Sequence, residues 1–282
     1  MFAPPRPALL LAAVLLALPV LAGCAVNPVT GQRELVLISR EQEIAVGNDA
    51  APEFEKEFGG KVASAPLQEY IRAVGTKVAA VSDRPMPYEY TLLASDVPNA
   101  FALPGGKIYI TAGLMKAMSN ERELAAVLGH ETAHVAAKHS VKQMQKQMGA
   151  QLLLEIAARA GGADTGQTAA DVGKVVSTMA LLKYSRDDEY QADQVGIEYA
   201  ARAGYNPWGM VELLTVLLNM QEQEPGRLEE MFQTHPLSSK RVEEAKAILT
   251  GNPAYDRWSP NVPDPNAASF QQMRRTLIQA VE

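Results

Sequence analysis

The stretch 123–140 reads ELAAVLGHETAHVAAKHS and contains three of the chain's four histidines. Each residue of an α-helix advances by about 100°. His130 and His134 therefore share one helix face, whereas His139 lies nearly opposite His130. Two imidazoles on one face can bind one metal ion, and Glu131 can reach a water molecule at that metal as a general base. This H-E-x-x-H pattern predicts a zinc site.

The alternative interpretation is that these polar residues lie on the solvated face of a long helix. The residues around them argue against it, because most are apolar: Leu124, Ala125, Val127, Leu128, Ala133, Val135 and Ala136. Such flanks predict a mostly buried helix. Polar groups on a buried helix are costly unless they have partners, so these side chains need a function.

A third ligand is expected further along the chain, in YSRDDEYQAD at 184–193. Glu189 and Asp193 are four residues apart on one helical face. Glu189 can be the third zinc ligand, and Asp193 can accept a hydrogen bond from the free N–H of a ligating histidine. Arg186 could orient Glu189, while Asp187 and Asp188 lie off that face and are expected to be solvated. An exposed, charged helix start remains the alternative. The ligand set predicts one zinc per chain.

The periodicity of apolar residues predicts a mainly helical chain with a few short strands. Helices are expected at 39–48, 66–82, 121–158, 168–183, 186–203, 207–222, 239–249 and 268–281, and strands at 88–93, 99–104 and 107–111. Pro104-Gly105-Gly106 can turn between the last two strands to make a hairpin. Residues 25–38 are predicted to be an extended tether, and 252–266 to wrap the surface before the last helix.

The N-terminus has the features of a secretory signal: an apolar run from Ala8 to Leu21 after a single Arg. It ends in Leu-Ala-Gly-Cys, which resembles the bacterial lipoprotein signal. That resemblance implies cleavage before Cys24 and lipidation of this cysteine. Ala25, in place of Asp, favours the outer membrane, facing the periplasm. A secreted protein with an unmodified cysteine is the alternative. Cys24 is the only cysteine, so no internal disulfide is possible.

Four motifs occur in order along the chain: NAFALPGGKIYITAGL, ELAAVLGHETAHVAAKHS, SRDDEYQADQVG and THPLSSKR. Together they resemble the M48 zinc metallopeptidases over roughly residues 24–250. The similarity is to the periplasmic lipoprotein branch and, more distantly, to the Oma1-like and CAAX-prenyl protease families. It implies a zincin-type α+β core, mainly helical, with an active-site helix and a small antiparallel sheet. It also implies that His130, His134 and Glu189 bind zinc and that Glu131 is the catalytic base.

The resemblance gives the other two motifs possible roles. NAFALPGG resembles an edge strand beside the cleft, where a substrate peptide could pair with Asn99 and Ala100; a plain hairpin is the alternative. His235, in THPLSSKR, would lie near the metal, where it could cap the zinc or stabilise the oxyanion, or it could simply be solvated. Arg241 could bind an anion or have a structural role.

These features divide the chain into a signal peptide (1–23), a tether (24–38), a metallopeptidase domain (39–251) and a C-terminal extension (252–282). The expected function is a zinc endopeptidase that cleaves misfolded or misassembled periplasmic and outer-membrane proteins. The expected partners are protein substrates, the membrane through Cys24, and the outer-membrane assembly machinery. An assembly factor or chaperone with latent proteolysis is the alternative. The formal net charge of −6 makes nucleic acid a poor partner.

Overall fold

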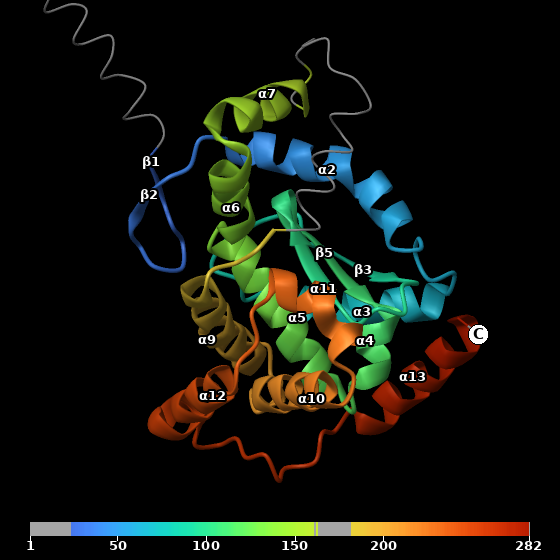
Figure 1. Ribbon diagram of the computed structural model, residues 1–282. Coiled ribbons are helices and arrows are strands. Elements are labelled where there is room, and N and C mark those ends of the chain that lie inside the picture. Colours follow the sequence, from blue (N-terminus) through green and yellow to red (C-terminus); the bar gives the residue numbers. More distant parts are fainter. Residues whose placement is uncertain (1–23, 161, 163–181, 282) are drawn as a thin grey trace, which may run out of the picture.

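A small mixed sheet surrounded by helices forms the centre of the molecule (Figure 1). The computed structural model describes residues 24–160, 162 and 182–281, and these confirm the predicted α+β, mainly helical class. The strands are β1 Cys24–Val26, β2 Arg33–Leu35, β3 Glu89–Leu93, β4 Ala100–Leu103 and β5 Lys107–Thr111. The helices are α2 Arg40–Glu57, α3 Ala65–Ala79, α4 Ala112–Ala117, α5 Glu121–Ala136, α6 His139–Met148, α7 Ala150–Ala160, α9 Arg186–Arg202, α10 Gly209–Gln223, α11 Glu229–Thr234, α12 Ser239–Gly251 and α13 Ala267–Val281.

The strand order β3-β5-β4 places β4 at an edge of the sheet. Strands β4 and β5 form the predicted antiparallel hairpin around a 3-10 turn at Pro104–Gly106. Gly105 has φ +81° in this turn, a conformation that favours glycine. Strand β3 pairs with β5 in the parallel sense, so only the β4–β5 half of the sheet is antiparallel.

The sheet is buried on both faces. Successive side chains of a strand point to opposite sides, and on β5 both sets pack into apolar clusters. On β5, Ile108 and Ile110 join the apolar cluster that includes α3 and α5. Tyr109, between them, joins a second cluster with α2, α6 and α7. Helix α5 therefore lies on one face of the sheet.

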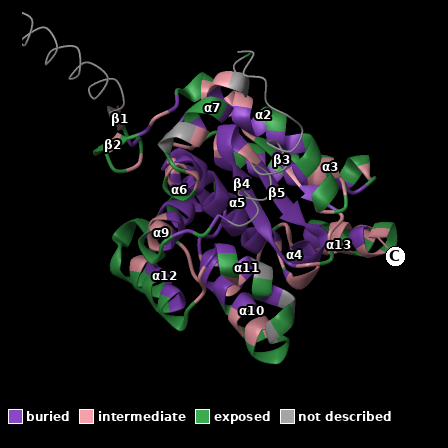
Figure 2. Ribbon diagram, turned by 45° about the horizontal axis from the view of Figure 1, so that its top comes forward, coloured by how far each residue is buried: buried purple, intermediate pink, exposed green. Residues whose placement is uncertain are grey.

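Every residue of α5 is buried, as the purple central helix in Figure 2 shows. The prediction of one continuous helix over 121–158 is wrong, because three helices occupy this range. Lys138 has φ +58° and Gly149 has φ +79°, and these left-handed residues separate α5, α6 and α7. His139 therefore begins a new helix instead of continuing the face opposite His130.

Two other segments differ from prediction. Helix α2 extends through Pro52 to Glu57, beyond the expected end at 48, because Val46, Ala50 and Phe54 continue its buried face. Part of the expected extended tether forms the antiparallel β1–β2 hairpin. The expected signal peptide at 1–23 lies outside the described residues, as does nearly all of the expected helix at 168–183. Within the described part of the chain, no helix has the length and apolar character needed to cross a membrane.

Candidate metal centre

The two histidines of H-E-x-x-H meet on α5 as the spacing predicts. Their Nε2 atoms are 3.0 Å apart, and both side chains are buried. Helix α9 packs closely against α5 at a contact between Gly129 and Gly196. A Cβ built on Gly196 would come within 2.9 Å of the backbone nitrogen of His130, so this contact requires small residues.

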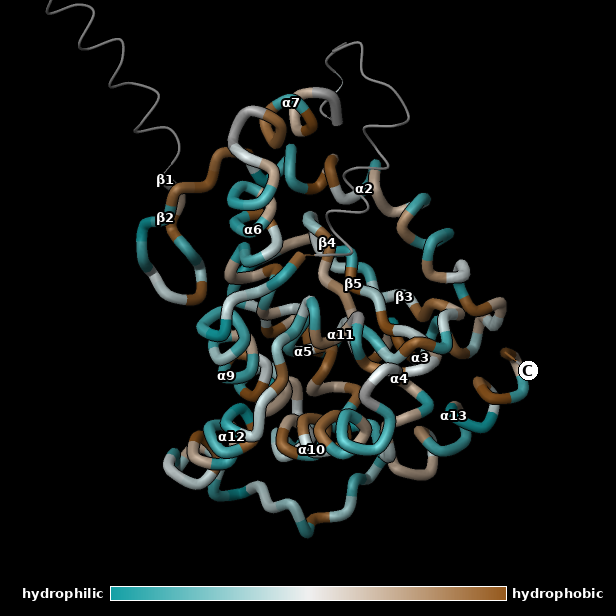
Figure 3. Tube along the Cα trace, viewed as in Figure 1, coloured by the Kyte–Doolittle hydropathy of each residue, from teal (hydrophilic) through white to brown (hydrophobic). Residues whose placement is uncertain are grey.

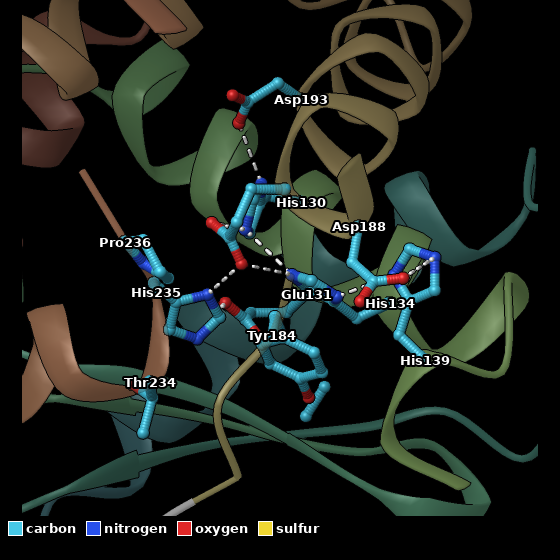
Figure 4. A network of polar contacts seen from close by, with 12 residues as sticks. His130, Glu131, His134, His139, Tyr184, Asp188, Asp193, Thr234, His235 and Pro236 are labelled. Atoms are coloured by element: carbon cyan, nitrogen blue, oxygen red, sulfur yellow. Dashed lines mark hydrogen bonds and ion pairs between the residues drawn. The ribbon is translucent and has the colours of Figure 1, made fainter. Parts of the chain in front are cut away.

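Figure 4 shows His130, His134 and His235 close together, and the close approach of α9 brings Glu189 to them. Its Oε1 lies 3.4 Å from His134 Nε2, and its Oε2 lies 3.6 Å from His130 Nε2. Ser185 begins α9 through the predicted capping box. Its hydroxyl accepts from Asp188 N, and the Asp188 carboxylate accepts from Ser185 N. This cap fixes the first turn of α9 and, with it, the position of Glu189.

His235 is the fourth member of the cluster and follows directly after α11. Its Nδ1 lies 3.0 Å from Glu189 Oε1, and each of the four residues offers a ligand atom within 4.8 Å of the others. Zinc binds nitrogen and oxygen at about 2.0–2.2 Å in a tetrahedron, which puts its ligand atoms roughly 3.3–3.6 Å apart. The distances from Glu189 to His134 and His130, 3.4 and 3.6 Å, fit such an ion, and the 3.0 Å between the two histidine nitrogens is slightly shorter.

The protonation states also suit a cation. Burial lowers the pKa of His134 well below its usual value, which leaves the neutral imidazole that metals bind. Burial alone would raise the pKa of Glu189, but the charges of Arg241 and His235 hold it well below its usual value. The cluster therefore offers a neutral imidazole at His134 and an ionised carboxylate at Glu189.

Glu131 lies beside this cluster and is 1% exposed. Its Oε1 is 3.8 Å from His235 Nε2, and its Oε2 has no hydrogen-bond partner within the described residues. Burial raises the pKa of Glu131 above its ordinary value, although the neighbouring histidines oppose this. A buried carboxylate with a free oxygen is suited to exchange a proton with a nearby reactant.

Asp193 and Arg241 surround the ligands. Asp193 Oδ1 lies 3.0 Å from His130 Nδ1, the ring nitrogen that faces away from the cluster, as expected for a carboxylate that orients a metal-binding histidine. Arg241 donates two hydrogen bonds to Asp193, of 2.7 and 2.6 Å, and its Nη1 lies 2.5 Å from Glu189 Oε2. Thus Arg241, and not the exposed Arg186, holds the Glu189 carboxylate.

His139 is a partner that the sequence analysis did not find. The break at Lys138 turns its ring towards His134, and the two Nδ1 atoms are 2.9 Å apart. On its other side, His139 Nε2 lies 2.8 Å from Gln191 Oε1 and 3.4 Å from Asp188 Oδ1. Asp188 is therefore not simply solvated, as had been expected. The Tyr184 ring also stacks on His134, with centroids 3.9 Å apart.

The peptidase family M48 model matches residues 65–249, which include the sheet, α5, α9 and most of α12. The chain belongs to this family. The match spans more than half of the chain and contains all four residues of the cluster.

Three M48 relatives span different shares of the chain. A beta-barrel assembly-enhancing protease of Yersinia pestis is 28% identical over 95% of this chain and 57% of its own length. The mitochondrial metalloendopeptidase OMA1 of Schizosaccharomyces pombe is 29% identical over 79% of this chain and 65% of its own. The metalloprotease LoiP of Escherichia coli is 31% identical over 70% of this chain and 78% of its own length. The chain thus spans less than two thirds of the first two relatives.

The M48 edge-strand motif lies where the resemblance places it, since β4 is at the edge of the sheet. Asn99 and Ala100 are each 1% exposed, however, and Ala100 N already donates to Asn99 Oδ1 at 2.9 Å. The carbonyl of Ala102 accepts from Ser140 Oγ at 2.8 Å. Two backbone groups of this strand are therefore already bonded, and the role of Asn99 and Ala100 in substrate binding stays a prediction.

Proposed function

We propose that this chain is a zinc-dependent endopeptidase of the bacterial cell envelope. The observation that carries the proposal is the buried cluster of His130, His134 and Glu189 with the free carboxylate oxygen of Glu131 beside it. Three protein ligands with one open position are typical of catalytic rather than structural zinc sites. The M48 family match and the protease names of the relatives support the same activity.

In this proposal, His130, His134 and Glu189 hold one zinc ion per chain. Zinc supplies Lewis acidity, which polarises a peptide carbonyl and makes water more acidic. Glu131 accepts the proton of the attacking water and then delivers it to the leaving amine. Asp193 holds the His130 ring, and Arg241 holds Glu189, so that the ligands keep their positions during turnover.

We further propose that Cys24 is lipidated and holds the protein at the periplasmic face of the outer membrane. The support is the Leu-Ala-Gly-Cys sequence after the apolar run 8–21. Misfolded or misassembled envelope proteins are the proposed substrates. Relatives in Yersinia pestis and Escherichia coli are named beta-barrel assembly-enhancing proteases, which favours outer-membrane proteins and their assembly machinery as partners.

The test is casein hydrolysis by the purified protein, compared with its Glu131→Gln variant. We expect cleavage by the unmodified protein and at least about a hundredfold loss in the variant, because the general base is removed. Zinc content should stay near one ion per chain in Glu131→Gln and fall in His134→Ala. Glu123→Gln, which removes another buried carboxylate of α5, is the control and should keep activity. Equal zinc in the unmodified protein and His134→Ala would contradict the ligand assignment.

An assembly factor or chaperone with latent proteolysis is the second candidate. It is favoured by the burial of Glu131, which is 1% exposed in this conformation. The Glu131→Gln variant separates the two functions in cells. If it restores every phenotype of a deletion, proteolysis is not the main function.

A further inference from the structure

Exposed large apolar side chains are few among the described residues, and two of the four lie on the short β1–β2 hairpin. Val26 is 55% exposed and Leu35 is 57% exposed; the other two are Leu154 of α7 and Val262. In Figure 3 the chain is brown at β1 and again just after β2, at the upper left of the view. Isolated apolar residues on a surface need no explanation, but these two lie on the same hairpin, the first of the described chain.

The register of the hairpin brings them together. Cys24 pairs with Leu35, and Val26 pairs with Arg33. Cross-strand partners, and residues two apart along a strand, share one face of a hairpin. One face therefore contains positions 24, 26, 33 and 35: a proposed lipidation site, two exposed apolar side chains and an exposed arginine.

The other face of the hairpin is fixed to the protein. The buried Asn27 donates to the carbonyl of Ala137 at 3.3 Å, directly after the active-site helix α5. Glu34 is 3.2 Å from Lys142 Nζ of α6. Gln145, also on α6, accepts from Leu37 N at 2.7 Å and donates to Leu35 O at 3.0 Å. The first residues after the signal peptide are thus held against α5 and α6.

We propose that the outer face of the β1–β2 hairpin (Val26, Arg33 and Leu35) lies on the phospholipid bilayer. The inference rests on the proposed lipidation of Cys24. The Cα atoms of Cys24 and Leu35 must lie within about 5.5 Å as register partners, and Val26 is about 7 Å along the strand. The headgroup layer of a bilayer is roughly 5–8 Å thick, so a lipidated Cys24 places both apolar residues in or next to it.

The chemistry of this face fits the surface of a bilayer. Val26 and Leu35 can enter the boundary between headgroups and acyl chains, while Arg33 pairs with anionic headgroups. Because the inner face is bonded to Ala137 and to α6, the membrane then sets the orientation of α5. The lipid anchor in this arrangement holds the metal centre in one orientation instead of on a loose tether.

The test uses the full-length, lipidated protein, in which Cys24 is blocked and an introduced cysteine is the only free thiol. A polarity-sensitive fluorophore is attached at Leu35→Cys or, as the matched control, at Val262→Cys. Val262 is a comparably exposed apolar residue (45%) in the segment between α12 and α13, at the bottom of Figure 1. Both variants are reconstituted in vesicles of phosphatidylethanolamine and phosphatidylglycerol.

We expect a blue-shifted emission and severalfold less quenching by aqueous iodide at position 35 than at position 262. Water-like emission at both positions in vesicle-bound protein would overturn the inference while leaving lipidation intact. Protein that stays out of the vesicles and lacks acyl mass on Cys24 would contradict both the proposed anchor and this inference. Protection of position 35 from iodide in native envelopes but not in pure lipid vesicles would indicate that a protein partner covers this face. That result would overturn the inference that the face lies on the bilayer.

Discussion

At the scale of single residues, His134 is held by a second histidine instead of the more common carboxylate or carbonyl. When Nε2 of His134 binds a metal, its proton lies on Nδ1 and is donated to Nδ1 of His139, 2.9 Å away. His139 then carries its own proton on Nε2 and donates it to Gln191 Oε1. Burial lowers the pKa of His139, although Asp188 opposes this, and the lower pKa favours the neutral ring that this arrangement needs.

We predict that His139→Phe lowers zinc affinity by about 10–100-fold, the range found when such orienting partners are lost. Competition with a chelator measures the affinity, and the melting temperature in EDTA reports any effect on the fold. Tyr184→Phe is the matched control. It keeps the ring that stacks on His134 and loses only the hydroxyl contact with Ser140. A changed melting temperature with unchanged zinc affinity would leave His139 a purely structural role.

A second prediction concerns His235, whose ring is within reach of the metal position. As a fourth ligand it would close the position that water needs, so His235→Ala should raise casein hydrolysis at saturating zinc. Gln233→Ala, an exposed position in α11, should leave the rate unchanged. A fall of roughly ten- to a thousandfold in His235→Ala would instead indicate that this histidine stabilises the oxyanion. An unchanged rate would remove both roles.

At the scale of elements, the first turn of α5 contains a buried carboxylate, Glu123, that bonds to the residues before the helix. Glu123 accepts from Ser119 N and from Asn120 Nδ2, both at 2.9 Å. Burial nevertheless raises the pKa of Glu123 to about 7, and nearby Glu212 adds to the increase. The folded state therefore holds this proton at pH values where the unfolded chain, with a pKa near ~4.3, has lost it.

The bound proton contributes its full share to the free energy of unfolding below about pH 4.3, and this contribution is lost as the pH rises through about 7. We predict that Glu123→Gln, which does not titrate, becomes more stable relative to the unmodified protein by about 1–3 kcal/mol between pH 4.5 and pH 8. Urea unfolding in EDTA at the two pH values measures the difference. Glu69→Gln, at a mostly exposed position, should show no such trend. A stability difference between Glu123→Gln and the unmodified protein that is the same at both pH values would contradict the raised pKa of Glu123.

The elements also show what the sequence could predict. Apolar periodicity and caps located α3, α5, α9 and the β4–β5 hairpin, because each is specified by local residues. The end of α5 was missed because Lys138 carries no glycine or proline signal for its left-handed conformation, which tertiary contacts impose. The same break explains why ideal helix geometry placed His139 opposite the site. Helical spacing was enough to propose His130, His134 and Glu189, whereas His235 was suggested only by the family resemblance. The role of Arg241 depends on how α12 packs against α9.

At the scale of the whole molecule, the C-terminal segment returns to the start of the active-site helix. It passes below α10 and α12 in Figure 1 before α13 begins. Asp264 Oδ2 accepts hydrogen bonds from Glu121 N at 2.8 Å and Arg122 N at 3.1 Å, two of the amides that a helix start leaves without partners. Arg122 also donates to the Val262 carbonyl at 2.8 Å. This distant segment therefore caps α5.

We predict that Asp264→Ala lowers the melting temperature by about 2–8 °C. The loss of a capping side chain costs about 1–2 kcal/mol, and each kcal/mol corresponds to roughly 2–4 °C in a chain of this size. Asp256→Ala, an exposed position in the same segment, is the control and should have little effect. Because α5 carries two of the proposed zinc ligands, added zinc should raise the melting temperature of both variants. Equal melting temperatures for Asp264→Ala and the unmodified protein would show that the extension covers α5 without stabilising it.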